Sequence, residues 1–182
     1  DNPAYFDLLV ANQVLGGSFS SRLVRDIRET KGYTYRIGSR LEHRRTSAVF
    51  RVRTPVRNEV LEPALEAIFE HLARLRSKTV TAEELEKAKS FLAGSFARSM
   101  ETQNGVADAV LHTYLHRLPP DFYDSYVQRV QAVTAAGVLR AANNFITPGE
   151  MVVVAVGDGA KIRETLAKFS SEPVVVLDQN GD

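Results

Sequence analysis

The sequence predicts an α+β protein with two layers, in which helices pack on one face of a mostly antiparallel sheet. Three patterns lead to this fold class. Two adjacent segments alternate apolar and polar residues, much of the remaining chain has apolar residues at helical spacing, and two short valine-rich runs lie near the C-terminus. Each predicted helix has one apolar stripe, and a sheet covered on one face by helices buries such stripes.

Two helices are expected at the N-terminus. The first covers residues 3–15, with Pro3 near its start and Gly16-Gly17 as its stop. Ser18 or Ser20 is placed to cap a second helix over residues 20–30. That helix ends before a glycine at position 32, as helices commonly do.

A β-hairpin follows. Residues 33–42 and 48–54 alternate with period two, and the polar segment 43–47 joins them as a turn. The alternation puts Tyr35 on the same side as Ile37 and Leu41, which is the expected core side of the first strand. The hairpin is therefore the predicted centre of the sheet.

The remaining chain is mostly helical. Helices are expected over residues 58–75, 105–118, 122–130, 135–145 and 160–169, the fourth of them capped by Thr134. Thr81 and Glu84 form a capping-box pattern, which predicts the start of a further helix. The apolar runs 151–156 and 174–177 are predicted to be strands.

Composition narrows the possible functions. The 182 residues are 44% hydrophobic and 25% charged, as in an ordinary globular protein, and no apolar run approaches the ~18 residues that a membrane span needs. Without cysteine there is no disulfide, thiolate metal site or cysteine nucleophile. We expect one soluble domain, cytoplasmic or periplasmic. Because residue 1 is Asp and no signal-like segment follows, we expect a processed chain or part of a longer protein.

Charge is unevenly distributed along the chain. Residues 22–57 contain eleven Lys or Arg and three acids, a local charge of +8, whereas the rest carries −7. A basic face can bind nucleic-acid phosphates, but no recognition motif is present. Solvated arginines on a free sheet face are the simpler interpretation, and a surface for an anion or a peptide is the other alternative.

Catalytic motifs are absent from the sequence. His112 and His116 share a helix face at the spacing of two zinc ligands, but no Glu lies between them and no third ligand is evident. We interpret them as ordinary histidines near a helix end. There is no G-x-S-x-G nucleophile motif, and Gly157-Asp158-Gly159 lacks a phosphate-binding pattern.

A specific resemblance begins at residue 15. The sequence resembles the second-domain signature of the pitrilysin/insulinase family of zinc metallopeptidases, which includes the mitochondrial processing peptidase and the core proteins of the cytochrome bc1 complex. The matching residues of the signature are Leu15-Gly16-Gly17, Ser21-Arg22-Leu23, Ile27-Arg28-Glu29, Gly32 and Tyr35. The similarity continues through Val80–Lys89, Leu118–Asp121, Val133-Thr134 and Val152–Asp158, and so covers nearly the whole chain.

The resemblance implies half of a metallopeptidase with the fold of processing-peptidase domains. In this family, one domain carries H-x-x-E-H and binds zinc, and a similar domain without those residues closes a chamber around the peptide. This chain lacks H-x-x-E-H. We expect residues 1–182 to be a single non-zinc domain, inactive alone. It would be the C-terminal half of a longer peptidase of bacterial type or one subunit of a two-chain enzyme, with zinc in the partner domain or subunit.

The resemblance also implies two substrate-binding residues. In active members an Arg and a Tyr seven residues apart hold the peptide, and Arg28 and Tyr35 match them. Guanidinium and phenol donors suit a peptide carbonyl or the oxyanion formed from it. The alternatives are a helix C-terminal cation for Arg28 and a core aromatic for Tyr35. Since Tyr35 must face the chamber, its predicted position on the core side requires either a bulge or a strand that begins after it.

Two functions remain open on the sequence. The first is the substrate-binding, non-zinc domain of a metalloendopeptidase, with the +8 segment lining a peptide chamber. The second is a catalytically silent scaffold like the respiratory core proteins. Nucleic-acid binding is a third hypothesis, and we expect no such partner.

Overall fold

The computed structural model describes residues 2–44 and 47–178. It begins with a helix that widens into a π-helical turn, and a second π-helical segment leads to the hairpin. The elements to this point are α1 (Tyr5–Asn12), η1 (Gln13–Gly17), η2 (Val24–Thr30), β1 (Gly38–His43) and β2 (Ala48–Arg53). The remainder is helical: η3 (Asn58–Val60), α2 (Leu61–Ser77), α3 (Ala82–Met100), α4 (Gln103–His116), α5 (Tyr126–Ala132), α6 (Ala135–Phe145), η4 (Pro148–Glu150) and α7 (Gly159–Ala167).

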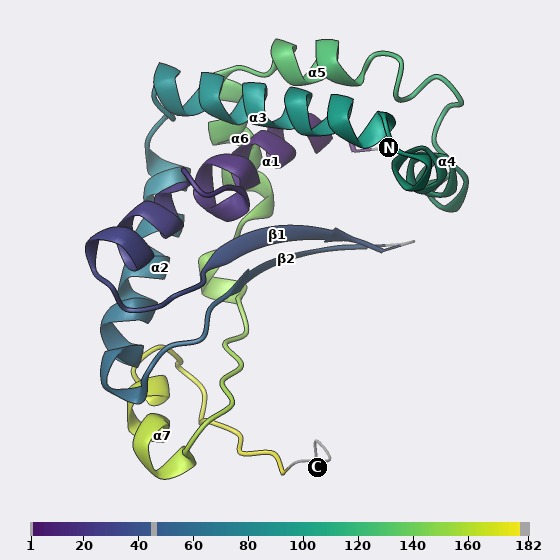
Figure 1. Ribbon diagram of the computed structural model, residues 1–182. Helices are drawn as coiled ribbons and strands as arrows, with labels where there is room; N and C mark the ends of the chain where they lie inside the picture. The colour runs from purple at the N-terminus through teal and green to yellow at the C-terminus, as the bar shows by residue number, and fades with distance from the viewer. Residues whose placement is uncertain (1, 45–46, 179–182) are drawn as a thin grey trace.

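Helices and sheet form two layers. Helices α1, α3, α5 and α6 lie on one side of the β1–β2 hairpin (Figure 1). Helix α2 runs along the edge of both layers, and α7 lies beside the end of α2 that is farther from α3. The strands pair antiparallel, with Gly38 opposite Arg53 and His43 opposite Ala48. The α+β class is confirmed, with a sheet of two strands within the described residues.

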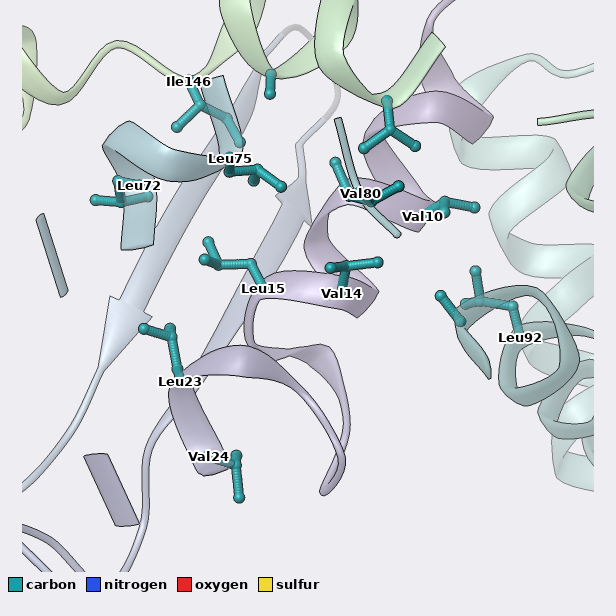
Figure 2. Close-up of a cluster of buried hydrophobic side chains, with 14 of the residues drawn as sticks. Val10, Val14, Leu15, Leu23, Val24, Leu72, Leu75, Val80, Leu92 and Ile146 are labelled. Carbon is teal, nitrogen blue, oxygen red and sulfur yellow. The ribbon is translucent and has the colours of Figure 1, made fainter. Parts of the chain in front are cut away.

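The core lies between α1, η1, η2, α2 and α6. Figure 2 shows Leu15, Leu75 and Ile146 gathered from three separate elements, with Val10 and Val14 nearby. The largest fully buried side chains are Leu15, Leu23, Ile27, Leu72, Leu75, Ile146, Val10, Val130 and Val138. Segments distant in sequence therefore share one apolar cluster, and burial of each side chain contributes about 1.5–3 kcal/mol.

Gly16 is where the helical layer meets the sheet most closely. A Cβ atom at Gly16 would lie 2.5 Å from the backbone nitrogen of Ser39 on β1 and 2.7 Å from its hydroxyl. The buried Ser39 hydroxyl also donates to the Oδ1 atom of Asn12 at 2.8 Å. Gly16 therefore lets the chain backbone contact β1, in addition to standing near the end of the first helix.

A partly buried ion pair connects the residues just before η2 to α3. Arg22 donates from Nε and Nη2 to the two carboxylate oxygens of Glu84, at 2.7 and 2.8 Å. Glu84 also accepts from the backbone N–H of Thr81 at 2.9 Å, and the Thr81 hydroxyl accepts from the Glu84 N–H, which confirms the predicted capping box. The hydrogen bonds from Arg22, and those from Thr81, outweigh burial and lower the pKa of Glu84 to about 2.

The two predicted C-terminal strands are wrong for this structure. Residues 151–156 and 174–177 have no strand assignment, and Val152, Val154 and Val156 are almost fully exposed. A strand requires a neighbour that pairs with its backbone, and no described segment pairs with either run. The valine-rich composition therefore indicated a preference for strand conformation, but neither run pairs with another described segment.

The N-terminal helix prediction also needs correction. Neither Ser18 nor Ser20 caps η2, which has no side-chain cap. Instead, the Ser21 hydroxyl donates to the Ser18 carbonyl oxygen at 2.6 Å and closes a turn. The predicted Thr134 cap is confirmed, since its hydroxyl accepts from the Gly137 N–H at 3.0 Å. The polar turn predicted at 43–47 includes residues 45–46, which lie outside the described residues.

Replacement of Gly16 by alanine is expected to destabilise the protein by about 1–3 kcal/mol, because the added methyl group overlaps the backbone of β1. The measurement is the urea unfolding midpoint. Gly149→Ala is the control, since no atom lies within 4 Å of its added Cβ. Equal midpoints for the two variants would contradict the close approach of Gly16 to Ser39.

Replacement of Glu84 by glutamine is expected to destabilise the protein by about 2 kcal/mol at neutral pH, because Arg22 loses its charged partner. The folded-state pKa of about 2 lies below the ordinary value of 4.5, so the carboxylate stabilises the fold fully above pH 4.5. That stabilisation is lost as pH falls from 4.5 toward 2. The difference in unfolding free energy between wild type and variant should shrink over the same range.

The adjacent Glu83 provides the matched control. Its exposed carboxylate pairs with Lys87 at the surface, where ion pairs contribute little to stability. Glu83→Gln should leave the urea midpoint nearly unchanged at every pH. A loss of stability equal to that of Glu84→Gln would contradict the assignment to the partly buried pair.

Candidate functional site

The site forms where η2 leaves the helical layer and enters the hairpin. Gly32 ends this helical segment with a φ of +61°, in the left-handed region that favours glycine. The backbone N–H of Lys31 donates to the Asp26 carbonyl at 2.9 Å, and that of Tyr33 to the Ile27 carbonyl at 3.0 Å. The helix end is thus satisfied before the chain turns toward β1.

Tyr35 lies in this connection and points to solvent. Its exposed fraction is 88%, whereas Tyr33 is half-buried and Ile37 is buried. β1 begins only at Gly38, so the alternation predicted from residue 33 does not apply to Tyr35. Of the two alternatives, a strand that begins after Tyr35 is the one observed. The predicted position of Tyr35 on the core side is wrong.

Arg28 lies next to Tyr35 in space. Its guanidinium carbon is 5.3 Å from the centre of the Tyr35 ring and 4.7 Å from the centre of the Phe19 ring. Its Nη1 atom is 3.3 Å from a carboxylate oxygen of Glu29. The fold therefore brings together the two residues that the sequence singled out, along with an aromatic ring from a separate turn.

A shallow groove adjoins this cluster. Residues 32–35 and 55–57 line a hollow of about 460 Å³, with Tyr35 and Arg57 at its border. The Thr34 hydroxyl donates to the Pro55 carbonyl and so joins the two lining segments. The groove thus includes a phenol from Tyr35 and a guanidinium from Arg57 in its lining.

Polar contacts fix the position of η2. The carboxylate of Asp26 contacts Lys31 Nζ at 2.7 Å and His71 Nε2 of α2 at 2.9 Å. Burial raises the pKa of Asp26, but the hydrogen bonds from Lys31 and His71 outweigh it and hold the pKa below its usual range. With the Arg22–Glu84 pair, this contact anchors η2 to two helices.

The predicted basic face of the hairpin includes Arg40, Arg51 and Arg53 but not Arg36, which precedes β1. Arg40 pairs directly with Arg51 across the hairpin, and Gly38 with Arg53, so these side chains share one face. Arg51 also forms an ion pair with Glu42. Arg36 precedes the strand and is exposed.

Histidine placement supports no metal centre. The Nδ1 atom of His112 is 3.0 Å from the Tyr123 hydroxyl, and its ring centre is 4.3 Å from that of His116. Among residues 2–44 and 47–178, no group of three or more His, Asp or Glu side chains could hold a metal ion. The described residues therefore do not fit a resident zinc ion. No helix in that part of the chain is long and apolar enough to cross a membrane.

Phe19 was missed by sequence reasoning. It is 69% exposed although it is large and apolar, and it contacts Arg28 from the turn at residues 18–21. A phenylalanine between two serines in a glycine- and serine-rich turn is the one signal that could have indicated it.

The two-layer arrangement of helices and hairpin is the fold of a class of domains found in zinc proteases. The family model described as the peptidase M16 inactive domain matches residues 1–92, and the chain belongs to this family. This confirms the resemblance to zinc proteases drawn from the signature residues.

Relatives agree with that assignment. The chain is 38% identical over 99 residues to the uncharacterized zinc protease YmxG of Bacillus subtilis, covering 54% of this chain and 24% of the relative. It is 32% identical over 139 residues to the uncharacterized zinc protease ML0855 of Mycobacterium leprae, covering 76% and 31%. The chain thus spans about a quarter to a third of these curated relatives.

Solved structures share the fold. A crystal structure of a peptidase M16 inactive domain from Pseudomonas fluorescens superposes with a TM-score of 0.75 at 27% identity, covering 81% of this chain and 35% of that one. A protease from Helicobacter pylori superposes with a TM-score of 0.69 at 18% identity, covering 81% and 36%.

Replacement of Gly32 by alanine is expected to destabilise the protein by about 1–2 kcal/mol, because φ is positive there. No atom lies within 4 Å of the added Cβ, so the backbone conformation alone accounts for the loss. Gly32→Asn should cost less, since asparagine tolerates this conformation better. Urea unfolding measures both, with Gly159→Ala as the control. Equal midpoints for Gly32→Ala and Gly159→Ala would contradict the requirement for glycine at this turn.

Proposed function

We propose that this domain is the substrate-binding, non-zinc half of a zinc-dependent metalloendopeptidase. In this role, residues 1–182 form a single domain that closes the peptide chamber. Arg28 and Tyr35 hold the scissile carbonyl and the oxyanion that forms from it. The observation that carries the proposal is the juxtaposition of the Arg28 guanidinium with the exposed Tyr35 ring beside a shallow groove.

The chemistry of the pair suits this role. The Arg28 guanidinium offers several N–H donors, and the Tyr35 hydroxyl offers one more. The guanidinium carbon lies over the faces of the Phe19 and Tyr35 rings, at 4.7 and 5.3 Å from their centres. Fixed donors directed at a developing negative charge stabilise the transition state of acyl transfer.

The proposal requires a partner. The described residues lack a zinc ligand set, so catalysis depends on a homologous domain in cis or a subunit in trans that carries H-x-x-E-H and zinc. The basic face around Arg40 and Arg51 would line the chamber and attract peptide carbonyl and carboxylate groups. The substrate is a peptide.

A scaffold role is the second candidate. Helix α4 presents exposed apolar side chains, with Val110 65% and Tyr114 83% exposed, and no residue of α4 is buried. Such a surface suits assembly with another protein and does not require catalysis. In that case Arg28 and Tyr35 would have no effect on turnover.

Removal of either donor is expected to lower kcat/KM for peptide cleavage by roughly 100-fold, the usual effect of losing one transition-state donor. The variants are Arg28→Ala and Tyr35→Phe, assayed in the complete peptidase with its zinc-bearing partner. Tyr35→Phe removes only the hydroxyl, so its effect reports a hydrogen bond rather than packing.

Matched controls lie elsewhere on the surface. Arg25→Ala removes an exposed arginine one turn earlier in η2, and Tyr114→Phe removes an exposed phenol from α4. Both should retain wild-type turnover, with melting temperature as the check on folding. Full activity of both Arg28→Ala and Tyr35→Phe would refute the catalytic proposal and favour the scaffold.

A further inference from the structure

Phe19 has an unusual environment for a large apolar side chain. It is 69% exposed and stands in the turn between η1 and η2, flanked by Ser18 and Ser20. Exposure of an aromatic ring forgoes the stabilisation that burial would provide. Its contact with a guanidinium suggests what the ring does there.

The turn holds Phe19 over Arg28. Ser18 accepts at its carbonyl oxygen from both the hydroxyl and the backbone N–H of Ser21, at 2.6 and 3.2 Å. These bonds close the turn on either side of the ring. The Arg28 guanidinium carbon then lies 4.7 Å from the centre of the Phe19 ring, closer than the 5.3 Å to Tyr35.

The Glu29 carboxylate competes with Phe19 for the Arg28 guanidinium. Glu29 follows Arg28 directly and has a carboxylate oxygen 3.3 Å from Nη1, with half of its side chain exposed. A mobile guanidinium could move fully onto that carboxylate and lose its orientation toward Tyr35. A guanidinium that stacks on an aromatic face keeps the N–H groups along its edge available as donors.

We propose that Phe19 is a positioning residue, which holds the Arg28 guanidinium beside Tyr35 with its donors free for the peptide. The position of Arg28 follows from contacts within this chain alone. Only the catalytic consequence rests on the proposed function. The expected loss without the ring is roughly 2- to 5-fold in kcat/KM, the range that one exposed cation–π contact supplies.

The first test is structural and needs no partner. In the ¹⁵N-labelled 182-residue chain, the Arg28 Nε–Hε proton resonance, assigned by its disappearance in Arg28→Lys, is expected upfield because of the aromatic rings. Phe19→Leu keeps apolar bulk without a ring and should move the resonance downfield. Phe19→Tyr keeps the ring and should leave it in place. An unchanged resonance in Phe19→Leu would overturn the proposal.

The second test is kinetic, in the complete peptidase. Phe19→Leu should lower kcat/KM, and Phe19→Tyr should keep the wild-type value. The melting temperatures of both variants should stay close to wild type because the side chain is exposed. If Arg28→Ala impairs cleavage and Phe19→Leu does not, the positioning role is wrong and the role of Arg28 stands. If Arg28→Ala has no effect, the proposed function fails, and the resonance shift alone decides whether Phe19 holds Arg28.

Discussion

The close approach of Gly16 to Ser39 is the constraint on which the rest of the structure depends. The backbone of η1 contacts that of β1, and the Ser39 hydroxyl is bonded to Asn12 in the same buried region. Because the interior is close-packed, this contact leaves the hairpin little freedom relative to the helical layer. The segment between η2 and β1 must then cross a fixed gap, and that segment carries Tyr35. The position of Tyr35 is thus determined by the contact between Gly16 and Ser39, which involves neither Arg28 nor Tyr35.

Two polar anchors complete the positioning of Arg28. Arg22 and Glu84 join η2 to the start of α3, and Asp26 and His71 join it to α2. Both contacts are partly buried, and removal of one partner from such a contact is costly because the other loses its hydrogen bonds. The signature motif therefore combines three physical roles within a short segment. Glycines allow close backbone contact or a positive φ, Arg22 anchors the helix, and Arg28 presents its guanidinium beside Phe19 and Tyr35.

Sequence reasoning succeeded where local patterns decide structure. The hairpin, the capping box at Thr81 and the cap at Thr134 were predicted correctly, because period-two alternation and caps depend on neighbouring residues. It failed for residues 151–156 and 174–177, where β-propensity was strong but pairing depends on a second segment. It also missed Phe19, whose contact with Arg28 spans nine residues and depends on how the turn folds back.

By itself, the sequence determined the α+β class, the family, the absence of H-x-x-E-H and the pairing of Arg28 with Tyr35 as candidates. These follow from residue identity and spacing. Only the tertiary structure decided that Tyr35 faces solvent, because the start of β1 at Gly38 depends on where β2 pairs and where η1 packs. Likewise, only the fold brought Phe19 over the guanidinium. Side-chain direction at a strand end is a long-range property, since it follows from contacts between segments that the chain brings together only on folding.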